Sequence, residues 1–146
     1  EKRLFSLSDL LHNLEELLQT NFQENNISFT LRCSPEPMMT EGDEKQLSQV
    51  FLNLLKNAMQ ALEGHPHGEL SLQAEQDEYI VIDITDNGPG IPPEIMDKVF
   101  IPFFTTKSEG TGIGLSLCKE IIRRHEGHLA IKESRAGKTV FHIELP

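Results

Sequence analysis

Tyr79-Ile-Val-Ile-Asp-Ile-Thr-Asp-Asn-Gly-Pro-Gly-Ile91 places a glycine-rich turn directly after a run of apolar residues. Residues 79–84 have the composition of a β-strand. Two glycines one residue apart let the backbone turn sharply and approach a ligand closely, and an acid at the end of the strand, Asp86, can accept a hydrogen bond from an exocyclic amine. Asp-Asn-Gly is also common turn chemistry. On this stretch alone, a ligand site and a simple tight turn are both open.

The segments on either side of this stretch predict a hairpin, a long loop, a helix and a second hairpin. Residues 70–74 form the partner strand, joined to residues 79–84 by four polar residues. The stretch from Asn87 to Gly114 is rich in Gly, Pro and Thr, and loops of this length are usually functional or disordered. A helix runs from near Ile113 to near Gly127, and strands at residues 129–132 and 139–145 flank a turn at Ala136-Gly137.

The part of the chain before residue 65 predicts two further helices and a strand. Ser6 and Asp43 each have the form of a helix-capping residue. The first helix ends at Asn25-Asn26 and the second near Gly64. Between them, apolar and polar residues alternate over residues 27–33, as in a strand with one buried face. The apolar positions of the first helix recur at helical spacing: Leu7, Leu11, Leu14, Leu18 and Phe22.

This order of elements lacks the steady strand–helix–strand alternation of a doubly wound parallel sheet. A mixed β-sheet packed on one face by three helices is the natural two-layer arrangement. We therefore expect an α+β two-layer sandwich. The length of 146 residues fits a single domain spanning residues 1–146.

The predicted second helix carries a narrow polar stripe opposite its apolar arc. Asn53 and Asn57 lie four residues apart in this stripe and so share one helix face. The carbonyl oxygen of an Asn side chain is a neutral ligand that suits a hard cation such as Mg²⁺, which keeps several waters and sits on phosphates. A solvated helix face explains the same periodicity.

Gly110-Thr-Gly-Ile-Gly-Leu115 opens the predicted third helix. Small residues at a helix N-terminus expose N–H groups and the positive end of the helix dipole to phosphate. The stretch is not a P-loop, because it lacks the required Gly-Lys-Ser/Thr, and it is not the dinucleotide fingerprint, because it follows a loop rather than a strand. A glycine triplet without a ligand function is an equal alternative.

The composition narrows the class of partner. A formal net charge of −10 argues against a nucleic-acid-binding surface, although backbone N–H groups still allow an anionic small ligand. No apolar run reaches membrane-spanning length, so this segment is not expected to contact a membrane. Cys33 and Cys118 fit no metal spacing and are expected to be reduced thiols. We expect a cytoplasmic location, in a full-length protein that could still be membrane-anchored.

Four segments together resemble the N, G1, F and G2 boxes of histidine kinase ATPase domains, in the order and at the spacing of that family. They are Asn53-Leu-Leu-Lys-Asn57-Ala, Asp86-Asn-Gly-Pro-Gly-Ile91, Phe100-Ile-Pro-Phe-Phe-Thr-Thr-Lys107 and Gly110-Thr-Gly-Ile-Gly-Leu-Ser116. The C-terminal Gly137-Lys-Thr-Val-Phe141 resembles the segment that closes the adenine pocket. The sequence of the third box is most similar to that of nitrogen-regulation-type sensor kinases. The resemblance covers nearly the whole chain.

The resemblance implies the Bergerat fold shared with gyrase, Hsp90 and MutL proteins, with ATP and Mg²⁺ as cofactors. Asn57 matches the Mg²⁺ ligand, and Asn53 matches a catalytic polar residue on the phosphate side. Asp86 matches the acid that reads the adenine amino group, Thr139 matches the pocket-closing threonine, and Lys107 lies where a cation could reach the γ-phosphate. Nucleotide contacts are expected from Asn57, Asp86, Gly88, Gly90, Ile91, Thr106, Gly110, Thr111, Gly112, Ile113, Gly114, Leu115 and Thr139.

The chain departs from the family pattern in two ways. Many relatives carry a Lys-Tyr pair after the second Asn, where this chain has Gln60 and Ala61, so Lys107 is expected to supply the cation instead. The family's phosphoacceptor motif is also missing, because none of the histidines stands in its setting: His12, His65, His67, His125, His128 and His142.

The function implied is that of an ATP-dependent protein-histidine kinase. The domain would bind Mg-ATP and donate the γ-phosphate to a histidine on a separate dimerisation domain of the same protein, and the receiver domain of a response regulator would then accept the phosphoryl group. Two alternatives share the fold: an anti-sigma-type serine kinase and an ATP-gated conformational module without phosphotransfer. A helix before Glu1 with His-Glu or His-Asp would favour the histidine kinase.

Overall fold

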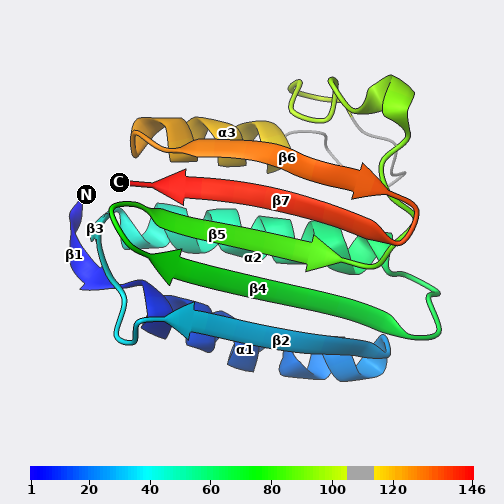
Figure 1. The fold of residues 1–146 in the computed structure, drawn as a ribbon, viewed down its shortest axis with the longest axis horizontal. Helices are drawn as coiled ribbons and strands as arrows, with labels where there is room; N and C mark the ends of the chain where they lie inside the picture. The colour runs from blue at the N-terminus through cyan, green and yellow to red at the C-terminus, as the bar shows by residue number, and fades with distance from the viewer. Residues whose placement is uncertain (105–113) are drawn as a thin grey trace.

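Three helices cover one face of a five-stranded sheet in the computed structural model, which describes residues 1–104 and 114–146 (Figure 1). The helices are α1 (Leu7–Glu24), α2 (Glu44–Ala61) and α3 (Gly114–Arg124), with a short 3-10 turn, η1, at Pro93–Ile95. The strands are β1 (Arg3–Ser6), β2 (Ile27–Ser34), β3 (Met39–Gly42), β4 (Gly68–Gln76), β5 (Ile80–Asp86), β6 (His128–Arg135) and β7 (Lys138–Leu145).

The five-stranded sheet has the order β2-β4-β5-β7-β6. The β2 and β4 strands pair parallel, and the other neighbours pair antiparallel. The helices lie behind this sheet in Figure 1, and its other face points to the viewer. The prediction of a mixed sheet with three helices on one face is confirmed. None of the described helices has an apolar stretch long enough to span a bilayer.

Side-chain caps set where two of the helices begin, as the sequence predicts. The Ser6 hydroxyl accepts a hydrogen bond from the Asp9 backbone N–H at the start of α1. The Asp43 carboxylate does the same for the Gln46 N–H at the start of α2. Each cap satisfies one of the N–H groups that a first helical turn leaves without an intrahelical partner.

The core lies between the sheet and the helices. Strand β4 shows the alternation that creates it, because Leu70, Leu72 and Ala74 are buried while Glu69 and Gln73 are exposed. The buried side of α2 provides the opposing layer with Leu47, Val50, Phe51, Leu54, Leu55 and Ala58. The carboxyl end of β5 and the end of α2 lie beside each other at this core.

A separate two-stranded ribbon of β1 and β3 was not predicted from the sequence. The two strands pair antiparallel, with Phe5 opposite Thr40, and Phe5 and Thr40 are both buried. The ribbon joins the N-terminus to the start of α2, far from the end of β5 (Figure 1).

Candidate nucleotide-binding site

Asp86 is the last residue of β5, which lies in the middle of the sheet. The residue is only 5% exposed, and one carboxylate oxygen, Oδ1, accepts a hydrogen bond of 2.9 Å from the Gly88 N–H. Within residues 1–104 and 114–146, Oδ2 accepts no hydrogen bond, and no fully buried side-chain nitrogen or oxygen atom lacks a partner. Burial raises the pKa of Asp86, and the hydrogen bond from Gly88 opposes the rise. A poorly solvated carboxylate with a spare oxygen is suited to accept a ligand N–H.

The glycine turn after Asp86 fits closely between α2 and the β6–β7 hairpin. A Cβ atom on Gly88 would stand 3.1 Å from the carbonyl oxygen of Ala61 in α2. Gly90 has a φ of +87°, and a Cβ atom there would stand 2.6 Å from the carbonyl oxygen of Arg135. Both positions therefore need glycine, Gly90 for conformation as well as space.

The β6–β7 hairpin holds this turn through hydrogen bonds. The Gly137 N–H donates to the Gly88 carbonyl oxygen at 2.8 Å, and the Ile91 N–H donates to the Ser134 hydroxyl at 2.8 Å. The Ser134 and Thr139 hydroxyls are 3.0 Å apart. Thr139 is buried and lies directly opposite Asp86 in the β5–β7 pair. The predicted residues Asp86, Gly88, Gly90, Ile91 and Thr139 thus come together at one end of the sheet.

The two asparagines of α2 are half-buried, unlike Lys56 and Gln60 of the same helix, which are exposed. The Cys118 thiol of α3 donates a hydrogen bond to the Val50 carbonyl oxygen of α2 at 3.7 Å. Burial raises the pKa of that thiol to about 11, and the nearby Asn53 side chain opposes the rise. Asn57 lies one helical turn before Ala61 and so one turn from the contact with Gly88.

The third predicted segment is only partly described. Gly114 and Leu115 begin α3, and Leu115 packs against the core. Thr106, Lys107, Gly110, Thr111, Gly112 and Ile113 lie outside the described residues. The last part of the loop before them is tied to the sheet by Phe100, whose ring packs edge-on against Phe141 with centroids 6.3 Å apart. The Lys119 ammonium of α3 lies 4.4 Å from the centroid of the Phe100 ring.

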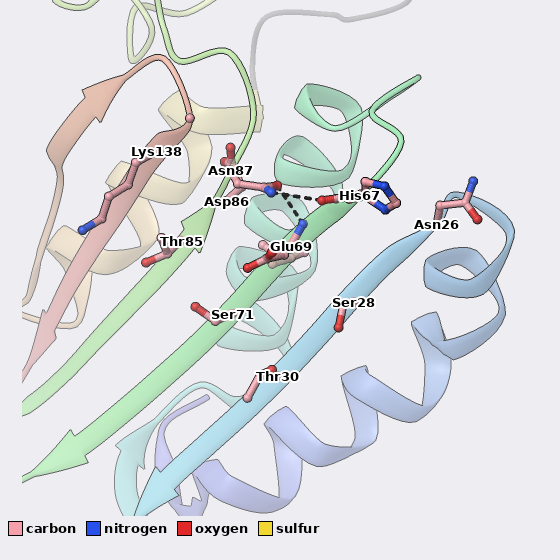
Figure 2. A pocket seen from close by; sticks show the side chains of 13 residues that line it. Asn26, Ser28, Thr30, His67, Glu69, Ser71, Thr85, Asp86, Asn87 and Lys138 are labelled. Atoms are coloured by element: carbon pink, nitrogen blue, oxygen red, sulfur yellow. Dashed lines mark hydrogen bonds between the residues drawn. The ribbon is translucent and has the colours of Figure 1, made fainter.

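A hollow of about 460 Å³ lies on the other face of the sheet, away from the helices (Figure 2). Ser28, Thr30, Ser71 and Thr85 line it, and Asn87 closes one end. The Asn87 side chain accepts from the Glu69 N–H at 2.7 Å and donates to the His67 carbonyl at 3.0 Å. The hollow is separated by the sheet from Asn53 and Asn57, so we place the candidate site on the helix side.

The family model of histidine kinase-, DNA gyrase B- and HSP90-like ATPases matches residues 42–146. The chain belongs to this family. It contains the ATPase-type domain of sensor histidine kinases, and such a domain fits protein-histidine kinase activity. The glycine turn, the α2 asparagines and the β6–β7 hairpin all lie within the matched residues.

Named relatives are similar over most of this domain. Sporulation kinase C of Bacillus subtilis (strain 168) is 38% identical over 144 residues, covering 96% of this chain and 33% of that kinase. The sensory histidine kinase/phosphatase NtrB of Rhodobacter capsulatus is 40% identical over 121 residues, covering 73% of this chain and 33% of NtrB. The predicted similarity to nitrogen-regulation-type kinases is thereby confirmed. The chain spans about a third of the length of these relatives.

Solved structures show the same fold. The nucleotide-free catalytic domain of histidine kinase ThkA is 32% identical, with a TM-score of 0.90, covering 100% of this chain and 95% of that domain. ThkA in complex with the response regulator TrrA matches with a TM-score of 0.83 and 30% identity, over 99% of this chain and 41% of ThkA.

Sequence reasoning missed Ser134, which makes hydrogen bonds to both the glycine turn and Thr139. A serine in a strand carries no motif of its own, and only the register of β6 against β7 brings it to this end of the sheet. The contact of the Cys118 thiol with α2 was also missed, because it depends on how α2 packs on α3.

Proposed function

We propose that residues 1–146 form one catalytic domain that binds Mg-ATP and donates the γ-phosphate to a histidine on a separate dimerisation domain. The observation that carries the proposal is the buried Asp86 carboxylate at the end of β5, with Oδ1 held by Gly88 and a glycine turn packed beside α2. Such a carboxylate suits the amino group of adenine as hydrogen-bond donor. It would repel the carbonyl that guanine has at the same place, so GTP should bind much more weakly than ATP.

Asn57 would be the protein's ligand to Mg²⁺, the role that the family resemblance gives it. Its half-buried position one turn from the glycine turn fits a neutral oxygen ligand. The described residues hold no cluster of three or more His, Cys, Asp or Glu side chains that could bind a metal, which suits a cation that takes most of its ligands from phosphate and water. When bound, the cation would neutralise charge on the phosphates.

The remaining roles are those that the family resemblance implies. Thr139 closes the base pocket opposite Asp86, and Gly114 and Leu115 at the start of α3 lie at a helix N-terminus, which favours phosphate. Asn53 would orient groups on the phosphate side. For the residues outside the described ranges, Thr106, Gly110, Thr111, Gly112 and Ile113 are proposed phosphate contacts and Lys107 a proposed cation to the γ-phosphate.

The reaction is a phosphoryl transfer in which the domain mainly positions ATP and stabilises charge. The imidazole nitrogen of the accepting histidine forms a bond to the γ-phosphorus, the bond from that phosphorus to the β,γ-bridging oxygen breaks, and ADP leaves. A response-regulator receiver domain would accept the phosphoryl group next, consistent with the complex in which ThkA was solved. The nucleophile belongs to the dimerisation domain.

Transfer in trans tests the proposal. Residues 1–146 are incubated with labelled Mg-ATP and the dimerisation domain from the same full-length protein, and the product is challenged with acid and base. An acid-labile, base-stable label on that domain is expected. Asn57→Ala should lose transfer while it still binds nucleotide without Mg²⁺, and the exposed neighbour Lys56→Ala is the matched control. Labelling of serine would indicate the anti-sigma-type kinase, and ATP binding without any transfer would indicate the conformational module.

A further inference from the structure

Strand β6 contains an irregularity that turns Ser134 toward the helix side of the sheet. Ile131 pairs with Phe141, and Glu133 pairs with Val140, so β6 has one residue more than β7 over this step. With regular alternation Leu129 and Ile131 would be followed on the inner face by residue 133. The bulge shifts this alternation and places Ser134 opposite Thr139. Bulges often re-aim a side chain next to a functional site.

Ser134 and Thr139 share one hydrogen bond, in which either hydroxyl can be the donor. A hydroxyl has one proton to donate and two lone pairs. The Ser134 oxygen accepts from the Ile91 N–H at 2.8 Å, which occupies one of its two lone pairs, and the Thr139 oxygen lies 3.0 Å away, within reach of the Ser134 proton. With Ser134 donating to Thr139, the proton of Thr139 is left to point at a ligand.

The direction of the hydrogen bond between Ser134 and Thr139 matters because Thr139 lies directly opposite Asp86 in the β5–β7 pair. Residues so paired have Cβ atoms about 5 Å apart, close enough to contact neighbouring atoms of one base. In the arrangement in which Ser134 donates to Thr139, Asp86 accepts from the base and Thr139 donates to it. Adenine carries the complementary pair, an amino donor beside the N1 acceptor, whereas guanine carries an O6 acceptor beside an N1–H donor.

We infer that Ser134 is a positioning residue that fixes the Thr139 hydroxyl as a donor beside Asp86 and so helps the site to select adenine over guanine. The inference rests on the proposed function, since it assumes that the base lies against Asp86. Ser134 acts through Thr139 and through the Ile91 N–H, which anchors the glycine turn. Without the Ser134 oxygen, the Thr139 hydroxyl is free to rotate and to accept from guanine as readily as it donates to adenine.

Calorimetry with ATP and with GTP tests this assignment on Ser134→Ala and Ser134→Thr. Because one hydrogen bond is affected, the ratio of ATP to GTP affinity should fall by roughly 3- to 10-fold in Ser134→Ala. Ser134→Thr keeps the hydroxyl and should restore the ratio. The control is Ser71→Ala, which removes another half-buried serine from the opposite face of the sheet.

The outcomes separate this inference from the proposed function. If the parent does not bind ATP, the proposed function fails and the inference fails with it. If the parent binds ATP, and Ser134→Ala keeps the parent's ratio or weakens both nucleotides equally, only the inference is wrong. If Ser134→Ala does not fold, the parent protein is tested instead with 1-deaza-ATP, an ATP analogue that lacks the N1 acceptor. Weaker binding than ATP supports the donor role of Thr139, and equal binding contradicts it.

Discussion

The buried carboxylate of Asp86 lowers the stability of the fold but favours ligand binding. Because the residue is only 5% exposed, its carboxylate loses most of its hydration, and the one described hydrogen bond to it comes from Gly88. The raised pKa of Asp86 expresses that cost. The same poor solvation leaves the carboxylate ready to bind a ligand N–H, because little water has to be displaced.

Asp86→Asn should therefore stabilise the domain without nucleotide while it abolishes tight ATP binding. The pKa of Asp86 in the folded protein lies above the usual 3.8, so folding is penalised as pH rises through that folded pKa. The variant lacks this penalty and keeps an oxygen for the Gly88 N–H. Thermal unfolding should show a gain at pH 7 that shrinks toward pH 3.8. Loss of the charge-assisted hydrogen bond to adenine should cost roughly 1.5–3 kcal/mol in calorimetry.

A variant that is less stable than the parent at every pH would show that the carboxylate itself holds the turn together. ATP affinity equal to that of the parent would show that the base binds elsewhere.

At the scale of elements, the site depends on the β6–β7 hairpin as much as on β5. Three points on the hairpin meet the glycine turn: Ser134 at the Ile91 N–H, Arg135 against Gly90, and Gly137 at the Gly88 carbonyl. The position of the turn is therefore set by a segment more than 40 residues later in the sequence. Substitutions in the hairpin should therefore alter nucleotide affinity even where the substituted residue does not contact the nucleotide.

Gly90→Ala and Gly137→Ala make a matched pair for this contact. Both glycines have positive φ, +87° and +89°, so alanine is strained at either position by roughly 1–2 kcal/mol. At Gly90 the new methyl group also meets the Arg135 backbone at 2.6 Å, whereas nothing lies within 4 Å at Gly137. Overpacking adds about 1–3 kcal/mol, so chemical denaturation should show the larger loss for Gly90→Ala. Equal losses of unfolding free energy in the two variants would mean that the hairpin moves to accommodate the methyl group at position 90.

The helices and the central strands could be predicted from the sequence because each has its own local pattern. Ser6 and Asp43 cap α1 and α2 as expected, and the apolar positions of β4 and β5 face the core. The ribbon of β1 and β3 could not be predicted, since four-residue strands are too short to show a period. Ser134 could not be predicted either, because the bulge reverses the alternation that the sequence suggests. Of the glycine triplet, the structure describes only Gly114.

The whole molecule is acidic, and part of that charge gathers around one histidine on the open face of the sheet. His142 lies 2.6 Å from the Asp83 carboxylate and 2.9 Å from the Glu144 carboxylate. Burial opposes the charged form of the imidazole, but the hydrogen bonds to Glu144 and Asp83 raise the pKa of His142 overall above 6.5. The ammonium group of Lys132 also lies 3.3 Å from Asp83.

Stability should accordingly decline as pH rises through the folded pKa of His142. A raised pKa means that the charged imidazole stabilises the fold fully below pH 6.5, the unfolded value, and that this stabilisation is lost above the folded pKa. His142→Gln, which keeps polar atoms near both carboxylates, should flatten this part of the curve of unfolding free energy against pH. An unchanged slope in the variant would assign the pH dependence to another group.

The domain as a whole should bind ATP but hardly hydrolyse it. Hydrolysis needs a group that orients water and accepts its proton, and the hydrolysing branches of the fold resembled here place a Glu one turn before the Mg²⁺ asparagine. This chain has Asn53 there, and an amide cannot take a proton near neutral pH. Glu44, at the start of α2, lies about 20 Å along the helix from Asn57 and pairs with Arg3 at 2.6 Å.

Phosphate release by residues 1–146 with Mg-ATP should therefore stay near the uncatalysed rate, while Asn53→Glu should raise it. Asn53→Gln is the matched control, because it lengthens the side chain without adding a base. Both variants change a half-buried side chain near Cys118, so thermal unfolding should confirm that each still folds. Steady turnover by the parent that disappears in Asp86→Asn would place the water-activating group elsewhere in the domain, and would favour an ATPase over a kinase that depends on its dimerisation domain for the nucleophile.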